Sequence, residues 1–156
     1  MNALIAYFSY TGHTRGIAQK MRGITDGTLF EIRPAIPYDP DYNTTERQGR
    51  KEIRDGYRPP LAQQTDLGAC DVILLGTPNW FNTIAPPVAT FLAENDFTSK
   101  IIIPFVTNGG GGLGHIPADI KALARGAKVL NSLNIYEDGG SDANNKIADW
   151  LKKSGL

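Results

Sequence analysis

Short apolar runs alternate with amphipathic segments along this chain of 156 residues. Most of the runs are continuous enough to be strands that are covered on both faces. They span residues 4–8, 28–33, 71–77, 101–107 and 128–135, and the run at 28–33 alternates partly with polar residues. Strands that alternate with helices predict an α/β fold, in which helices cover both faces of a five-stranded parallel sheet.

The segments between these runs carry apolar residues at helical spacing. In the last of them, Ile147, Trp150 and Leu151 recur at i, i+3 and i+4, which is typical of a helix with one buried face. Proline is favoured in the first turn of a helix, and Ser or Asp just before it. The predicted helix starts are Arg15, Pro86 or Pro87, Pro117, and Ser141 or Asp142.

Residues 34–66 interrupt this pattern, with prolines at both ends. A polar helix is predicted over Asn43–Asp55, with Thr44 or Thr45 as its cap. The segment has few large apolar residues, so we expect it to be an insertion within a single domain that spans residues 1–156. Its tyrosines (Tyr38, Tyr42 and Tyr57) and its arginines would line a ligand cleft. The alternative is a solvated helix whose tyrosines cover the edge of the core.

Pro104 lies inside an otherwise clear strand, Ile101–Thr107. Proline has no N–H to donate to a sheet and is rare in central strands. We therefore expect a bulge or a skipped hydrogen bond at this position.

The composition narrows the classes of function. Sixteen basic residues balance sixteen acidic ones, so no overall field would attract nucleic acid or an anionic membrane. The single cysteine cannot form an internal disulfide. No apolar run approaches the roughly 20 residues of a membrane span, and the N-terminus does not have the pattern of a signal peptide. We therefore expect a cytoplasmic protein.

The loop after the first strand, Ser9–Thr14, has the composition of an anion site. It holds three Ser and Thr hydroxyls and a glycine directly before a predicted helix, where free N–H groups favour negative charge. The loop has no lysine, which a nucleoside-triphosphate loop needs for the terminal phosphates. It therefore suits one phosphomonoester held by neutral donors. The alternative is an ordinary helix cap, Thr11 or Thr14, without a ligand.

Two more loops follow the ends of predicted strands, where ligands bind in sheets of this kind. Residues 78–83 expose Trp80 and Phe81 for stacking on a ring. Residues 108–115 are nearly all backbone, which lets N–H groups approach a polar edge. Together the three loops predict a site for a flat aromatic ring on a phosphate tail.

The sequence gives weaker support for three other features: a dinucleotide site, a zinc site and a catalytic histidine. Gly109, Gly111 and Gly114 match the dinucleotide pattern G-x-G-x-x-G, but they follow the fourth strand. The pattern would place its acid near Asn134, and the nearest acids, Glu137 and Asp138, lie beyond the predicted fifth strand and not at its tip. Two histidines and one cysteine without metal-ligand spacing argue against zinc, and we expect no metal site. His115 would be a proton donor to a substrate if it reached the ring.

The motifs Ser9–Thr14, Thr77–Trp80 with Ile84–Pro86, and Pro104–Gly110 resemble those of the flavodoxin family, over nearly the whole chain. The resemblance implies a three-layer, doubly wound sheet with strand order 2-1-3-4-5 and non-covalently bound FMN. In that family the first loop holds the phosphate, the second flanks the isoalloxazine with its Trp against it, and the third binds the pyrimidine edge. The implied FMN-binding residues are Ser9, Tyr10, Thr11, Gly12, His13, Thr14, Thr77, Pro78, Asn79, Trp80, Phe81, Asn82, Thr107, Asn108, Gly109 and Gly110.

The chain departs from well-known flavodoxins in two ways. Those proteins are acidic around the flavin, whereas loops 78–83 and 108–115 contain no Asp or Glu. Because nearby negative charge disfavours adding electrons, we expect this flavin to be easier to reduce fully. Loop 78–83 also lacks the glycine that often flips there on reduction. Asn82 tolerates a positive φ better than most residues, so a flip stays open.

The resemblance implies a redox protein that acts through FMN, either as an electron carrier for a partner protein or as an oxidoreductase. One specific alternative is an NAD(P)H-dependent quinone or nitro reductase with a substrate pocket over the flavin. Another, of a different class, is a non-redox ligand-binding domain on the same fold. The sequence leaves the donor, the acceptor, the catalytic residues and the oligomeric state open.

Overall fold

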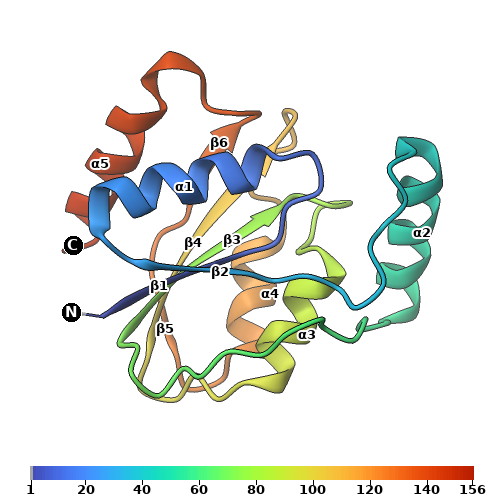
Figure 1. Cartoon of the computed structure of the whole chain (residues 1–156), viewed down its shortest axis with the longest axis horizontal. Helices are drawn as coiled ribbons and strands as arrows, with labels where there is room; N and C mark the ends of the chain where they lie inside the picture. Colours follow the sequence, from blue (N-terminus) through green and yellow to red (C-terminus); the bar gives the residue numbers. More distant parts are fainter. Residues whose placement is uncertain (1) are drawn as a thin grey trace.

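The sheet lies at the centre of the protein, whose computed structural model describes residues 2–156 (Figure 1). Its strands are β1 (Ala3–Tyr7), β2 (Thr28–Glu31), β3 (Val72–Pro78), β4 (Ile101–Asn108), β5 (Lys128–Val129) and β6 (Leu133–Tyr136). All neighbouring strands are parallel, and their order is β2-β1-β3-β4-β5, with β6 also pairing with β4. The predicted α/β class and the order 2-1-3-4-5 are confirmed.

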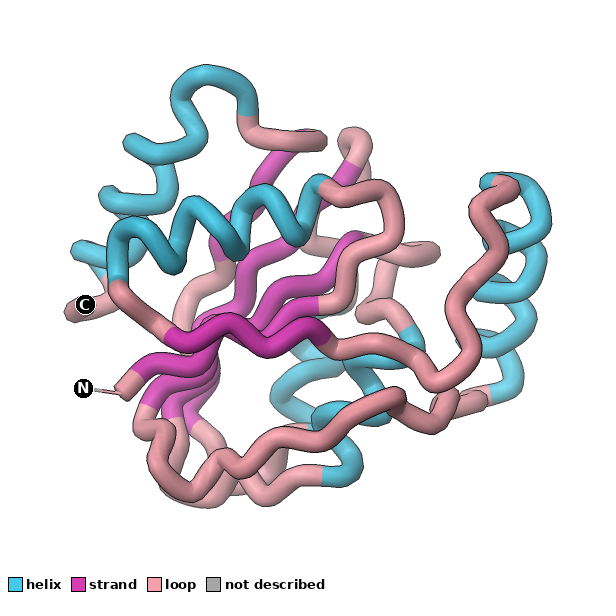
Figure 2. Tube along the Cα trace, viewed as in Figure 1, coloured by secondary structure: helices cyan, strands magenta, loops and turns pink. Residues whose placement is uncertain are grey.

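Helices cover the sheet in two layers, one on each face (Figures 1 and 2). The helices of these layers are α1 (His13–Thr25), α3 (Pro86–Glu94), α4 (Ile116–Leu123) and α5 (Ala143–Lys153), the last preceded by a short turn at Gly140–Asp142. Residues of β1 alternate between the layers: Leu4 and Ala6 pack in the core under α3 and α4, whereas Ile5 and Tyr7 pack under α1 and α5. Burial on both faces explains why the strand is apolar throughout.

The fifth strand of the sheet is interrupted at residues 130–132, and Pro104 lies opposite the gap. On this side of β4, the N–H of Leu130 donates to the carbonyl of Ile102 (2.9 Å) just before the gap. On the other side, the register with β3 runs without a bulge over residues 101–107. Of the two predicted outcomes, the bulge is wrong. The missing proline donor instead falls where the ladder to the fifth strand is broken.

The insertion holds a further helix, α2 (Tyr42–Asp55), which stands apart from the two helical layers (Figures 1 and 2). Its two connecting segments run side by side, because the N–H of Ala35 donates to the carbonyl of Pro60 and the N–H of Ala62 to that of Arg33, both at 2.7 Å. The short antiparallel contact fixes both ends of the insertion close to the edge strand β2.

The cap of α2 differs from the prediction. Asp41, not Thr44 or Thr45, precedes the helix, and its carboxylate accepts hydrogen bonds from the N–H (2.9 Å) and the hydroxyl (2.7 Å) of Thr44. A carboxylate at this position satisfies free N–H groups and also interacts favourably with the positive end of the helix dipole. These hydrogen bonds hold the pKa of Asp41 below its ordinary value.

Candidate functional site

The loops after β1, β3 and β4 meet at the carboxyl ends of these strands and are joined by hydrogen bonds. The hydroxyls of Thr14 and Thr107 lie 2.7 Å apart, and the two residues are only 1% and 3% exposed. The backbone N–H of Asn79 donates to the carbonyl of Thr107 (2.9 Å). The structure thus brings the three predicted loops together through contacts within the chain.

The turn from β1 into α1 leaves backbone N–H groups free. Gly12 precedes the helix with a φ of 100°, a left-handed value that favours glycine, and its N–H donates to the hydroxyl of Ser9 (3.1 Å). Within residues 2–156, the N–H groups of His13, Thr14 and Arg15 find no acceptor. The glycine has no side chain to cap the helix, unlike the threonine cap of the alternative interpretation. These amides at a helix N-terminus form a cradle that fits an anion.

The arginine beside this cradle is engaged elsewhere. The guanidinium of Arg15 donates to the carboxylate of Glu31 at 2.6 Å, and this bond raises the pKa of Arg15. Burial, and then the negative charge of Glu31, raise the pKa of Tyr7, which lies against the same pair. The cradle therefore presents neutral backbone and hydroxyl donors, as the composition of the loop predicts.

The second loop folds into a tight turn at Trp80–Thr83. These two residues exchange N–H···O bonds of 3.0 and 3.1 Å, and the residues between them, Phe81 and Asn82, have φ values of 54° and 73°. Positive φ at both central positions is the pattern of a type I′ turn. The expectation that Asn82 accepts a positive φ is confirmed, whereas a bulky residue such as Phe81 rarely adopts this conformation.

The glycine-rich third loop packs against this turn. The side-chain amide of Asn79 donates to the carbonyl of Gly112 (2.9 Å), and the N–H of His115 donates to the carbonyl of Asn82 (2.8 Å). At Gly114, which has a φ of 53°, a Cβ atom would lie 2.8 Å from the carbonyl oxygen of Asn82. Gly114 is therefore needed for close approach to the second loop, whereas Gly109 and Gly110 leave backbone exposed.

Trp80 lies in a cluster of aromatic side chains. Its ring is edge-to-face with the rings of Phe8, Tyr10 and Tyr38, at centroid distances of 5.5, 6.0 and 5.1 Å. Helix α2 packs directly on the indole, because a Cβ atom at Gly49 would lie 3.1 Å from two of its ring carbons. Aromatic pairs of this geometry are favourable beyond the area they bury. The cluster fixes the orientation of Trp80 before any ligand binds.

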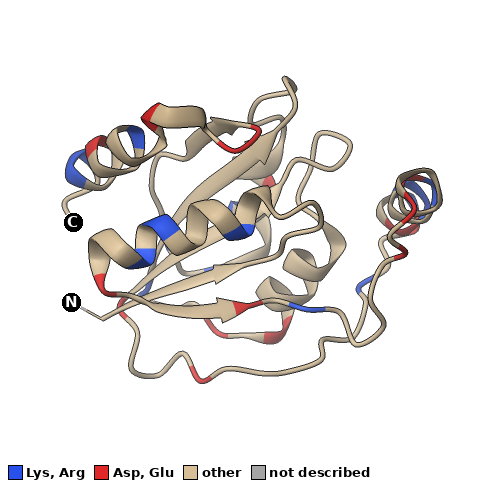
Figure 3. Ribbon diagram, turned by 45° about the horizontal axis from the view of Figure 1, so that its top comes forward, with Lys and Arg blue, Asp and Glu red and all other residues tan. Residues whose placement is uncertain are grey.

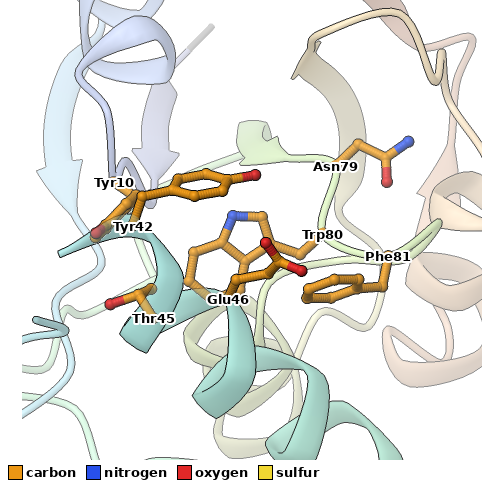
Figure 4. A pocket seen from close by; sticks show the side chains of 7 residues that line it. All are labelled: Tyr10, Tyr42, Thr45, Glu46, Asn79, Trp80 and Phe81. Carbon is orange, nitrogen blue, oxygen red and sulfur yellow. The ribbon is translucent and has the colours of Figure 1, made fainter.

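A cavity of about 150 Å³ opens beside Trp80, between α2, the first loop and the turn (Figure 4). Tyr10 and Tyr42 lie on one side of the indole and Phe81 on the other. The lining residues are Tyr10, Tyr42, Thr45, Glu46, Asn79, Trp80 and Phe81. Phe81 is 38% exposed, and the guanidinium of Arg50 lies over its ring at 4.5 Å from the centroid.

Three of these lining residues, Tyr42, Thr45 and Glu46, come from α2. Tyr42 was predicted to line a ligand cleft, whereas Thr45 was considered only as a helix cap and Glu46 was not predicted. They recur at i, i+3 and i+4, so they share one face of α2. This spacing is the sequence signal that could have identified the face of α2 that lies against the site. The prediction that tyrosines of the insertion line a cleft holds for Tyr42 at this cavity. Tyr38 packs in the aromatic cluster instead, and Tyr57 is not among the residues that line this cavity.

The same face of α2 is anchored by a buried carboxylate. Glu52 is 8% exposed and accepts hydrogen bonds from the hydroxyl of Tyr38 (2.6 Å) and the side-chain amide of Gln48 (2.8 Å). Burial, and then the bond to Glu52, raise the pKa of Tyr38 well above its ordinary value. A buried carboxylate needs such partners, so the bonds fix how α2 sits on the aromatic cluster.

Two more residues of the predicted site, Thr77 and Asn108, use their side chains to hold the loops through hydrogen bonds. Thr77 is fully buried, and its hydroxyl donates to the carbonyl of Pro78 (2.8 Å) and accepts from the N–H of Ala85 (3.2 Å), so it shapes the loop. The side chain of Asn108 accepts from the N–H of Gly110 (3.0 Å) and donates to Asn134 (2.6 Å).

Comparisons with known proteins identify relatives. The family model described as flavodoxin matches residues 2–154. A protein of Bacteroides eggerthii DSM 20697, provisionally named a flavoprotein, has 26% identity and a TM-score of 0.87, over 99% of this chain and 98% of its own. A second protein of provisional flavoprotein name, from Bacteroides uniformis ATCC 8492, has 29% identity and a TM-score of 0.86, over 97% of each chain.

A flavoprotein of Lactobacillus acidophilus NCFM, whose structure is a complex with FMN, shares the fold at 23% identity and a TM-score of 0.71. The alignment covers 92% of this chain and 98% of that one. No curated protein matches the sequence. Across residues 2–156, every helix is too short or too polar to cross a membrane.

Proposed function

Because the chain belongs to the flavodoxin family, we propose that it is a redox protein that works with non-covalently bound FMN. The residues present fit this cofactor. The free N–H groups at His13–Arg15 match a phosphate, and the exposed backbone at Gly109 and Gly110 matches the polar edge of a ring. Structural relatives with FMN, one from Lactobacillus acidophilus and a flavodoxin from Fusobacterium nucleatum, support the assignment.

When bound, FMN supplies the capacity to accept and release one or two electrons. The chain positions it and controls what reaches it. The cradle before α1 binds the phosphate through neutral donors, and the turn at Trp80–Thr83 presents backbone groups already held at positive φ. The contact between Thr14 and Thr107 keeps the phosphate loop at a fixed distance from the third loop. No acid–base side chain is required for electron transfer itself.

Within this class we propose an oxidoreductase that uses NAD(P)H and a small acceptor. The observation that carries this choice is that α2 of the insertion adds Tyr42, Thr45 and Glu46 to the wall of the cavity beside Trp80, where a small acceptor would lie next to the flavin. In the net reaction the nicotinamide donor gives up a hydride, which holds two electrons and one proton. A quinone acceptor takes up that hydride and one proton from water to become a hydroquinone.

The distribution of charge supports the same choice. Figure 3 shows acidic and basic residues side by side on α2 and α5. Several are paired one turn apart, as in Lys51–Asp55 (2.6 Å) and Lys153–Asp149 (2.9 Å), and the formal net charge of the chain is zero. An electron carrier gains speed from a surface of one sign that steers its partner, and mixed charge gives no such steering.

The purified protein tests the proposal through its visible spectrum. Flavin absorption bands, and release of FMN on denaturation, are expected. Anaerobic addition of NADH or NADPH should then bleach these bands rapidly. Bands that do not bleach would instead support a carrier reduced by another protein. A colourless protein that cannot be reconstituted with FMN would overturn the proposal and favour a non-redox binding domain.

A further inference from the structure

We propose that Asp119 of α4 is a positioning residue for the flavin. Its carboxylate accepts a hydrogen bond from the hydroxyl of Thr83 and so holds the Trp80–Thr83 turn in shape before the cofactor binds. The inference rests on the proposed function, because the turn positions a ring only if FMN binds beside it. It adds a carboxylate that lies outside the three loops, and neither Asp119 nor Thr83 is among the residues that the family resemblance assigns to FMN.

The turn needs support from its surroundings. Its two central residues, Phe81 and Asn82, have φ values of 54° and 73°. This left-handed conformation is unfavourable for a bulky residue such as Phe81, whose side chain is also 38% exposed and gains little from burial. Backbone in such a conformation persists where neighbouring groups over-determine it, and it is concentrated at functional sites. The groups that hold the turn are therefore candidates for a role in function.

The start of α4 holds two consecutive residues of the turn. The N–H of His115 donates to the carbonyl of Asn82 (2.8 Å), and the carboxylate of Asp119 accepts from the hydroxyl of Thr83. His115 and Asp119 are four residues apart, so they lie on the same face of the helix. A hydrogen bond to an ionised carboxylate is stronger than one between neutral groups. Asp119 therefore provides the stronger of these two contacts.

Helix α4 is a firm support because its other face is in the core. Ile116 and Ile120, which directly follow His115 and Asp119 in the sequence, are both 0% exposed. The N–H of Asp119 donates to the carbonyl of His115 (2.9 Å), so both residues belong to the same helical turn. The position of the Asp119 carboxylate is thus fixed by the packing of the helix and not by a mobile loop.

The held turn leaves one peptide donor and one acceptor available to a ring. The N–H and the carbonyl of Phe81 make no hydrogen bond within residues 2–156. A group that is already fixed in orientation does not have to be ordered when a ligand binds, and this saving appears as affinity. Without Asp119 the Thr83 end of the turn is released, and FMN binding has to order it again. We therefore expect Asp119 to contribute to FMN affinity without touching the cofactor.

Hydrogen exchange measured by NMR tests the hold on the turn directly. The N–H of Thr83 closes the turn on the carbonyl of Trp80 (3.1 Å), so its exchange rate reports opening of the turn. In Asp119→Ala this rate should rise at least about tenfold, while the amides of the buried strand β4 keep their rates. Asp119→Asn retains an oxygen that can accept from Thr83 and should stay within about threefold of the wild type.

A matched control removes a carboxylate that also binds a threonine, but far from the site. Asp96 accepts from the N–H of Thr98 (2.9 Å) in the segment before β4, at the other end of that strand. Asp96→Ala should leave the exchange of Thr83 unchanged. A faster exchange of all amides in Asp119→Ala, β4 included, would show general destabilisation and would overturn the inference.

Titration with FMN, followed by flavin fluorescence, tests the consequence for the cofactor. Asp119→Ala and Thr83→Val should each raise the Kd of FMN about tenfold. The double variant should be no weaker than the weaker single variant, because both changes remove the same contact. Asp119→Asn and Thr83→Ser, which keep an acceptor and a donor, should restore most of the affinity, and Asp96→Ala should bind as the wild type does.

The outcomes separate this inference from the proposed function. A protein that takes up no FMN would refute the redox function, and the exchange rates would still test the hold of Asp119 on the turn. A wild type and an Asp119→Ala variant that bind FMN equally well would refute the positioning role and leave the redox function intact. Equal losses in Asp119→Asn and Asp119→Ala would show that the charge acts and not the hydrogen bond to Thr83, and would also overturn the inference.

Discussion

The buried pair of Thr14 and Thr107 makes a prediction about how the cradle is held. Their hydroxyls are 2.7 Å apart and almost fully shielded from water, so each is the partner that the other needs. Valine has nearly the shape of threonine without the hydroxyl. Replacing one threonine by valine therefore leaves the other hydroxyl buried without its partner. Such a loss costs roughly 1–3 kcal/mol of folding stability.

The double variant Thr14→Val/Thr107→Val should lose less than the sum of the two single variants. Replacing both partners by apolar groups of the same shape removes the unsatisfied hydroxyl and is often close to neutral. We expect a coupling free energy of at least about 1 kcal/mol, within the range measured for residues in contact. Each single variant should lower the midpoint of thermal unfolding by about 2–4 °C for each kcal/mol lost.

Urea unfolding followed by circular dichroism, with excess FMN and without it, measures all four proteins of the cycle. Thr28→Val on the exposed edge strand β2 is the control, because within residues 2–156 the Thr28 hydroxyl makes no hydrogen bond, and its effect should stay within about 0.5 kcal/mol. If the free energies of the single variants simply add in the double variant, the two hydroxyls do not depend on each other. The reasoning from the buried pair would then be wrong.

Two further predictions concern the contact between the loops and the cap of α2. Gly114→Ala should cost at least about 2 kcal/mol and weaken FMN binding, because it combines a left-handed φ with a clash against Asn82. Gly112 also has a left-handed φ, 68°, but a Cβ atom there would meet no neighbouring atom, so Gly112→Ala should lose only the stability that the unfavourable φ costs. Equal midpoints of thermal unfolding for Gly112→Ala and Gly114→Ala would contradict this reasoning. Asp41→Asn keeps a cap that accepts from Thr44 but loses the charge. Because the folded-state pKa of Asp41 is lowered, the wild type should be more stable than the variant above about pH 3.8 and should lose this advantage as the pH falls through the folded pKa. Thermal unfolding of both proteins from about pH 7 to about pH 2.5 measures this advantage. A difference in midpoint that stays constant over this range would refute the prediction.

The sheet and its two helical layers could be predicted because each rests on a local pattern. Continuous apolar runs mark strands that are buried on both faces, and the i, i+3, i+4 stripe of Ile147, Trp150 and Leu151 marks a helix with one buried face. The strand order was not available from these patterns and came from the family resemblance. The break in the fifth strand was suggested only indirectly, by Pro104 in the neighbouring strand.

The loops of the site could be located from the sequence, but their geometry could not. Their position follows from the rule that ligands bind at the carboxyl ends of parallel strands. The turn at Trp80–Thr83 places Phe81 at positive φ, although local preference is against it there. The turn is held by contacts more than thirty residues away in sequence, from Asn79 to Gly112 and from His115 to Asn82. Such contacts override local propensity and leave no periodic signal.

The insertion shows the limit of hydrophobic periodicity most clearly. The buried face of α2 consists of Thr45, Gly49 and Glu52, none of which is apolar, so the helix has the sequence of a solvated one. It is held by close packing of Gly49 on Trp80 and by the bonds of Glu52, both of which need a tertiary partner. The same face carries Glu46 to the cavity. The expectation of an easily reduced flavin rests on the lack of acids in loops 78–83 and 108–115. It therefore omits the carboxylate of Glu46, which reaches the site from the insertion.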